Sequence, residues 1–128
     1  MKVKLLSFLL FSIVFLAGCS DYDQDGNTTS EKAKQKYDAA INQVIKSENQ
    51  YLKKQQVDRQ LKRNSGETGV IVYEDQDLIE IYYDQSSRGE RAIYQKDGST
   101  YARKTYTKRI SRKIDDSEKK YLENIGIK

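Results

Sequence analysis

The chain opens with a mostly apolar run, Leu5 to Ala17, which follows the basic residues Lys2 and Lys4. This layout is typical of a secretory signal, and the run is shorter than the ~20 apolar residues that a membrane-spanning helix needs. It ends in Leu16-Ala17-Gly18-Cys19, which places the only cysteine of the chain directly after small residues. We therefore expect residues 1–18 to be a signal peptide, cleaved between Gly18 and Cys19.

A second apolar pattern has the three-and-four spacing of a helix. It follows Thr28-Thr29-Ser30-Glu31, which has the spacing of a capping box. The recurring positions share one helix face, and polar residues occupy the rest: Tyr37, Ala40, Ile41, Val44, Ile45, Tyr51 and Leu52. The pattern predicts a helix from Ser30 to Lys54 whose apolar face covers a sheet. Val57 and Leu61 fit one further turn before Asn64-Ser65-Gly66 ends it.

After Gly66 the apolar residues follow the period of a strand. Two β-branched and aromatic runs, 68–74 and 77–84, predict strands separated by a turn at Asp75-Gln76. In the second run Ile79, Ile81 and Tyr83 share the face opposite Glu80, so we expect that face to meet the helix.

Three further elements complete the expected domain. A third strand is expected at 91–95, and Asp97-Gly98 predicts a tight turn into a fourth strand at 100–110. Asp115-Asp116-Ser117 predicts the cap of a short C-terminal helix that runs through Leu122. The expected fold class is α+β: one long N-terminal helix packed on a four-stranded antiparallel sheet, with a short C-terminal helix, over residues 30–128.

Composition limits the chemistry of the remaining 110 of 128 residues. Lys2 and Lys4 leave with the signal, so 21 basic residues face 19 acidic ones, a net charge of +2. All three Phe lie in the signal and Trp is absent, which leaves tyrosine as the aromatic residue of the core. His is also absent, and so a Ser or Cys catalytic triad cannot be assembled. We expect a monomeric single domain that is not an enzyme.

Residues 19–29 are polar and acidic without Lys or Arg, which predicts a flexible tether. Asp21, Asp23, Asp25 and Gly26 match the opening of an EF-hand calcium loop, but position twelve of that loop is Lys32 instead of glutamate. These aspartates are a weak calcium candidate, and the alternative is a solvated acidic spacer. We expect no bound metal.

The strongest charge asymmetry lies between Tyr101 and Lys113, where there is no acidic residue and six cations occur: Arg103, Lys104, Lys108, Arg109, Arg112 and Lys113. In a strand they would project alternately to both sides and form a charged rim. One interpretation is an edge that binds polyanions. The other is an edge strand charged to prevent aggregation.

Two further groups have a functional and a structural interpretation. Glu80, Asp84, Tyr82 and Tyr83 could line a catalytic cavity, but strand residues of this kind are more often a solvated sheet face. Six tyrosines on the expected strands could stack on a flat ligand, but about half of them are expected in the core: Tyr73, Tyr82, Tyr83, Tyr94, Tyr101 and Tyr106.

The segment 16–19 resembles the lipobox of bacterial lipoproteins, in which the cysteine thiol receives a diacylglyceryl group. With the polar tether, the helix stretch Tyr37 to Lys54 and the strand meander, the chain resembles small Gram-positive lipoproteins of cystatin-like fold. The resemblance implies a lipid on Cys19, no other cofactor, and a location on the outer face of the bacterial cell membrane. It carries no established activity. Protease inhibition is disfavoured because the chain has no Pro and no Trp for the inhibitory hairpins.

The expected function is that of a membrane-anchored extracytoplasmic binding module. The membrane is one partner, through the lipid anchor. Anionic wall polymer or lipid headgroups are candidate partners of the basic segment, and the protein partner is not identified. The alternative is a small cone-shaped enzyme or ligand-binding protein with a tyrosine-lined cavity.

Overall fold

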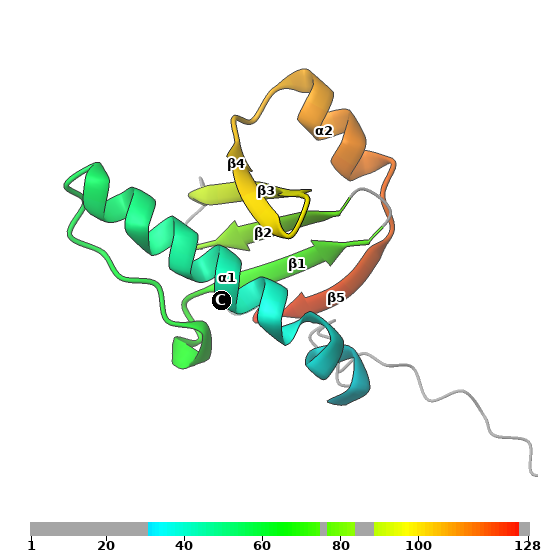
Figure 1. Ribbon diagram of the computed structural model, residues 1–128, viewed down its shortest axis with the longest axis horizontal. Helices are drawn as coiled ribbons and strands as arrows, with labels where there is room; N and C mark the ends of the chain where they lie inside the picture. Colours follow the sequence, from blue (N-terminus) through cyan, green and yellow to red (C-terminus); the bar gives the residue numbers. More distant parts are fainter. Residues whose placement is uncertain (1–30, 75–76, 84–88, 126–128) are drawn as a thin grey trace, which may run out of the picture.

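The computed structural model describes residues 31–74, 77–83 and 89–125. Several predicted features lie outside these residues: the expected signal peptide, Gly18, Cys19, the expected tether with its calcium candidates Asp21, Asp23 and Asp25, and Asp84. Within them, none of the helices combines the length and apolarity that crossing a bilayer requires. Figure 1 shows the arrangement of the elements.

Helix α1 (Glu31–Lys54) has the bounds that the apolar stripe predicted, to within one residue. Glu31 lies in its first turn and Lys53 and Lys54 in its last, and both placements complement the helix dipole. Ile41 and Val44 are fully buried on the stripe.

The helix ends in a Schellman motif, in which Gln56 N donates to Lys53 O and Val57 N donates to Leu52 O. Gln56 takes the positive φ of 58° that the motif requires. The further helical turn that we expected at Val57 and Leu61 is therefore wrong. Beyond it lies a 3-10 turn, η1 (Arg63–Ser65).

The sheet is antiparallel and has five strands in the order β4-β3-β2-β1-β5. The strands are β1 (Gly69–Tyr73), β2 (Leu78–Tyr82), β3 (Arg91–Asp97), β4 (Thr100–Lys104) and β5 (Lys119–Glu123). Strands β1 to β4 form the expected meander, with Gly98 at positive φ in the predicted Asp97-Gly98 turn. The α+β class is confirmed, and the expected count of four strands is wrong.

The prediction is wrong in the C-terminal third, where the structure has a helix followed by a strand and we expected a strand followed by a helix. The expected fourth strand ends at Lys104, helix α2 (Lys108–Asp115) begins within its last three expected residues, and β5 lies where the short helix was expected. Thr107 caps α2, because its hydroxyl accepts a hydrogen bond from Ile110 N at 3.3 Å. Ile110 and Ile114, four residues apart, are the helical signal that β-propensity at 100–110 obscured.

The sheet is covered on both faces. On one face Val70, Val72, Ile79 and Ile81 pack against the stripe of α1, as expected for the side of β2 without Glu80. On the other face Ile110 packs in a second cluster with Ile71, Tyr73, Leu78 and Ile93. Helix α2 therefore closes the face opposite α1 (Figure 1).

Candidate functional site

The basic segment is divided between two elements. Arg103 and Lys104 end β4, which is an edge strand of the sheet, and the other four cations lie on α2. We expected the six cations to project alternately to the two sides of one long strand. This expectation is wrong beyond Lys104, where β4 ends. The segment lies on an edge strand, as expected, only where it belongs to β4.

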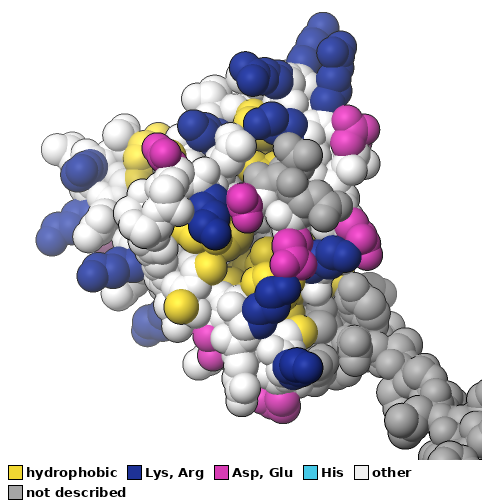
Figure 2. Space-filling view, turned by 45° about the vertical axis from the view of Figure 1, so that its right-hand side comes forward, with side chains coloured by type: hydrophobic (Ala, Val, Ile, Leu, Met, Phe, Trp, Pro, Cys, Tyr) yellow, Lys and Arg dark blue, Asp and Glu magenta, His cyan; other side chains and the backbone are white. Residues whose placement is uncertain are grey.

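The cations of α2 lie away from the buried side of the helix. Ile110 faces the sheet, whereas Lys108, Arg109 and Arg112 are exposed and Lys113 is half-buried. Lys and Arg side chains gather in Figure 2 at the end of the molecule where Figure 1 places α2. Among the described residues, no carboxylate forms an ion pair with any of these four cations. We call Lys108, Arg109, Arg112 and Lys113 the α2 cationic face.

Part of this arrangement is unfavourable for the helix itself. Arg112 and Lys113 lie in the last turn, where positive charge complements the helix dipole, but the other two cations do not. Lys108 and Arg109 lie in the first turn, which has no acidic residue, so positive charge meets the positive end of the helix dipole. The pairs Lys108/Arg112 and Arg109/Lys113 are each four residues apart, and a like-charge pair at this spacing destabilises a helix by roughly 0.2–0.5 kcal/mol. The sequence therefore keeps a charge pattern that local stability disfavours, a conflict that is characteristic of functional surfaces.

Arg103 does not belong to this face. Its guanidinium turns to the α1 side of the sheet, where Nε lies 2.9 Å from Glu48 Oε2 and Nη2 lies 3.4 Å from Oε1. The same guanidinium stacks over the Tyr51 ring at 3.9 Å. Its positive charge is therefore paired with Glu48 inside the fold.

Glu48 is the acceptor at the centre of this cluster and is 0% exposed. Tyr94 donates its hydroxyl to Oε2 at 2.8 Å, and Tyr83 donates to Oε1 at 3.2 Å. Burial raises the pKa of Tyr94 well above its ordinary value, and the hydrogen bond to Glu48 raises it further. Both carboxylate oxygens are therefore occupied by donors, which stabilise a charge that would otherwise be costly to bury.

A second buried carboxylate lies on the opposite face of the sheet. Glu80 is 1% exposed, accepts the Tyr73 hydroxyl at 3.1 Å and pairs with Arg91 at 3.1 Å. The Arg91 guanidinium stacks over the Tyr106 ring at 3.9 Å. Burial, followed by the nearby charge of Glu80, raises the pKa of Tyr82 to about 12. The expectation that Glu80 lies on a solvated sheet face is wrong, because α2 and its cluster cover that face.

A third cluster ties the loop after α1 to the last strand. Arg63 Nη2 lies 2.8 Å from Glu123 Oε2, and its Nη1 lies 2.6 Å from Asp38 Oδ1 on α1. The hydrogen bond to Glu123 raises the pKa of Arg63 above its ordinary value. Burial and the same carboxylate raise the pKa of Tyr121 to about 12.

The six tyrosines have different environments. Tyr73 and Tyr94 are fully buried, Tyr82, Tyr83 and Tyr101 are half-buried, and Tyr106 is 47% exposed. They lie on both faces of the sheet and do not form one stacking platform. The hydroxyls of Tyr73, Tyr83 and Tyr94 donate hydrogen bonds to the two buried carboxylates, Glu80 and Glu48.

The sequence contained a signal for Glu48 that our interpretation left out. Glu48 lies on the apolar stripe, seven residues after Ile41 and four before Leu52. A charged residue at such a position indicates a buried carboxylate that needs donors from another element. Among the residues that the structure describes, no cluster of three His, Cys, Asp or Glu could hold a metal ion.

Comparison with known proteins identifies the fold. No protein-family model matches the sequence, and no curated protein matches it. The structure is similar to the crystal structure of a DUF4467 family protein from Staphylococcus aureus, with a TM-score of 0.51 and 20% sequence identity. The match covers 68% of this chain and 95% of the other. The two chains therefore share the arrangement of a long helix on an antiparallel sheet.

Proposed function

We propose that the chain is a lipid-anchored binding module outside the bacterial membrane, and that the α2 cationic face binds polyanions. The observation that carries this proposal is the set of four cations on α2, which have no acidic partner among the described residues and two of which, Lys108 and Arg109, lie in the unfavourable first turn of the helix. A surface that only prevented aggregation would not need cations in the first turn of a helix. Counterion release from a polyanion would offset the local cost.

The lipid anchor is the second part of the proposal. The lipobox-like residues 16–19 support attachment through a diacylglyceryl group on Cys19, which would hold the domain close to the membrane surface. The polyanions available there are lipid headgroups and anionic wall polymers. Both present phosphate groups, so one cationic face suits either.

We propose no catalytic role. Glu48 is the carboxylate closest to a tyrosine-rich catalytic arrangement, but both its oxygens already accept hydrogen bonds from Tyr83, Tyr94 and Arg103. A general base needs a free lone pair directed at its substrate. The arrangement supports a role of Glu48 in stability.

The test measures retention of residues 20–128, without lipid, on two supports: anionic liposomes and purified wall polymer. We expect retention at low salt that falls steeply at physiological salt, because released counterions dominate the binding. Changing Lys108, Arg109, Arg112 and Lys113 together to Gln should abolish retention. The support that retains the wild-type chain identifies the source of the anion.

The matched control changes Lys32, Lys34, Lys62 and Lys96 to Gln. These lysines are exposed and lie outside α2, and the change in net charge is the same. Equal loss of retention in both variants would show that only net charge matters. Equal retention of wild type and the α2 variant would leave α2 without a binding role.

A further inference from the structure

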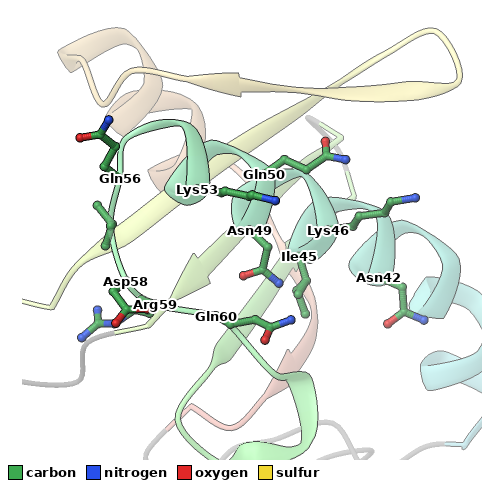
Figure 3. Close-up of a pocket in the computed structure, with 11 residues that line it drawn as sticks. Asn42, Ile45, Lys46, Asn49, Gln50, Lys53, Gln56, Asp58, Arg59 and Gln60 are labelled. Carbon is green, nitrogen blue, oxygen red and sulfur yellow. The ribbon is translucent and has the colours of Figure 1, made fainter.

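A groove lies on the α1 side of the molecule, lined mostly by residues with polar side chains and also by Ile45 and Val57. It is open, has a volume of about 700 Å³, and runs between the second half of α1 and the segment 56–60 (Figure 3). Five of its lining residues carry side-chain amides: Asn42, Asn49, Gln50, Gln56 and Gln60. Figure 3 shows Gln60 extending from the segment toward Ile45 and Asn49 of the helix.

Local structure keeps this groove open. The Schellman motif turns the chain away from the helix at Gln56. Five residues later Asn49 fixes the returning chain, because its Oδ1 accepts a hydrogen bond from Leu61 N at 2.7 Å and its Nδ2 donates to Leu61 O at 3.1 Å. The buried Leu61 then anchors the segment to the core. The segment is thus held at both ends and cannot collapse onto the helix.

The lining has an excess of positive charge. Lys46 and Lys53 lie two helical turns apart, and neither forms an ion pair with a described residue. Arg59 is already held by Glu90 at 3.1 Å and by the Tyr83 ring at 5.6 Å. Asp58 is the one acidic residue of the lining. The charges of the lining without an ion pair among the described residues are therefore those of the two lysines and of Asp58, which leaves an excess of one positive charge.

The lining chemistry selects one class of ligand. It includes no aromatic side chain against which a sugar ring would stack. Amide side chains offer both a donor and an acceptor, which are the groups that match the N–H and C=O of a peptide main chain. Seven residues of helix separate the two lysines by ~10 Å, a span covered by about three residues of extended peptide.

We infer that this groove binds an extended acidic peptide segment of a partner protein. Lys46 and Lys53 pair with its carboxylates, while Gln50, Gln60 and Asn42 hydrogen-bond its main chain. The occupant is a second protein, separate from the polyanion that we propose for α2, since α1 and α2 cover opposite faces of the sheet. The inference does not depend on binding by α2.

The test measures binding of a fluorescent octaglutamate peptide by anisotropy. The protein is residues 20–128 with the four α2 cations changed to Gln, so that α2 contributes nothing to the signal. Changing Lys46 and Lys53 to Gln should weaken binding roughly threefold to tenfold, the range expected for two exposed ion pairs. The matched control, Lys32→Gln with Lys34→Gln, removes two exposed cations of α1 outside the lining and should bind as before.

A second variant tests the groove itself. Gln60 is exposed, so Gln60→Trp should fill the groove without disturbing the core and should abolish peptide binding. Backbone amide shifts at residues 46–53 on titration with the peptide should disappear in this variant.

Three outcomes would overturn the inference. If the Lys46/Lys53 variant and the Lys32/Lys34 control weakened binding equally, the peptide would be responding only to the net charge of the protein. Binding of an acidic oligosaccharide such as oligogalacturonate at these residues, without peptide binding, would assign the groove to a glycan. Peptide binding that appears only after residues 20–30 are removed would make the acidic tether of the chain itself the occupant.

Discussion

Glu48 on α1 and Arg103 on β4 are joined across the interface between helix and sheet, with Oε2 2.9 Å from Nε. Glu48 is 0% exposed, and the Arg103 side chain is 31% exposed. Glu80 and Arg91 repeat the arrangement on the other face, again with a tyrosine donor and with an aromatic ring under the guanidinium. Each face of the sheet therefore carries one buried carboxylate neutralised by an arginine that reaches solvent.

Arg103→Met should lower the free energy of unfolding by about 2–3 kcal/mol, because Glu48 would remain buried without its charge partner. The figure is below the range for fully buried pairs, since solvent reaches Arg103. Adding Glu48→Leu should recover much of the loss by removing the buried charge. Lys104→Met, on the same strand without an ion pair, is the control in urea unfolding. A loss below ~0.5 kcal/mol for Arg103→Met would contradict the role of this pair.

Ile41→Asp should unfold the domain. Ile41 is fully buried against the sheet. The free energy of burying an unpaired charge there exceeds the free energy of unfolding of a typical small domain. Lys46→Asp on the exposed side of α1 should change the unfolding free energy by less than ~1 kcal/mol. Circular dichroism of the two variants measures the difference. Equal effects would mean that the buried face of α1 is assigned wrongly.

Ile110→Ala should destabilise the domain by about 2–4 kcal/mol, because Ile110 fills the second core beneath α2. Arg112→Ala, on the exposed side of the same helix, is the control. Hydrogen exchange should accelerate in residues 108–115 more than in α1. Unchanged exchange in α2 would show that Ile110 does not hold the helix on the sheet.

Alkaline pH should unfold the domain. Burial raises the pKa of Tyr82 and of Tyr121 to about 12, above the ordinary value of 10.0. Their contribution to stability is therefore complete below pH 10 and is lost as pH rises from 10 to 12. Because the chain has no His, the urea midpoint should be nearly constant between pH 6 and 9. A tyrosinate absorbance titration completed by pH 11 would contradict the assignment.

Cys19→Ala should abolish incorporation of labelled fatty acid and leave either uncleaved precursor or protein released to the medium. The measurement is metabolic labelling followed by fractionation of cells and medium. Ser20→Ala is the control at the neighbouring position. Continued labelling of Cys19→Ala would exclude lipid attachment at this cysteine.

The fold was predictable from the sequence wherever one period dominated. The α1 stripe buries one regular face, and the β-branched and aromatic runs of β1 to β3 are buried strands, so pattern and structure agree. Half of the residues between Tyr101 and Leu122 are charged, and the few large apolar residues there do not follow one period. The N-cap at Thr107 stabilises the start of helix α2, and pairing with β1 stabilises residues 119–123 as a strand.

The candidate sites were less predictable, because they depend on contacts between distant segments. The basic residues were identified from composition, but the separation of Arg103 from the α2 cationic face required knowledge of Glu48, 55 residues earlier. The groove depends on one amide, that of Asn49, holding a loop twelve residues away. No local pattern encodes either relationship.

The position of β5 in the sheet determines the order in which the fold can be completed. Strand β1 pairs with β2 through a short local turn, but its other neighbour comes from residues 119–123, close to the end of the chain. Local pairings form early, whereas contacts between distant segments bear the entropy of closing a long loop. During synthesis the buried strand β1 therefore keeps one unpaired edge until residues 119–123 have emerged. An unpaired apolar edge recruits other strands, so the pairing of β5 with β1 protects this edge from aggregation.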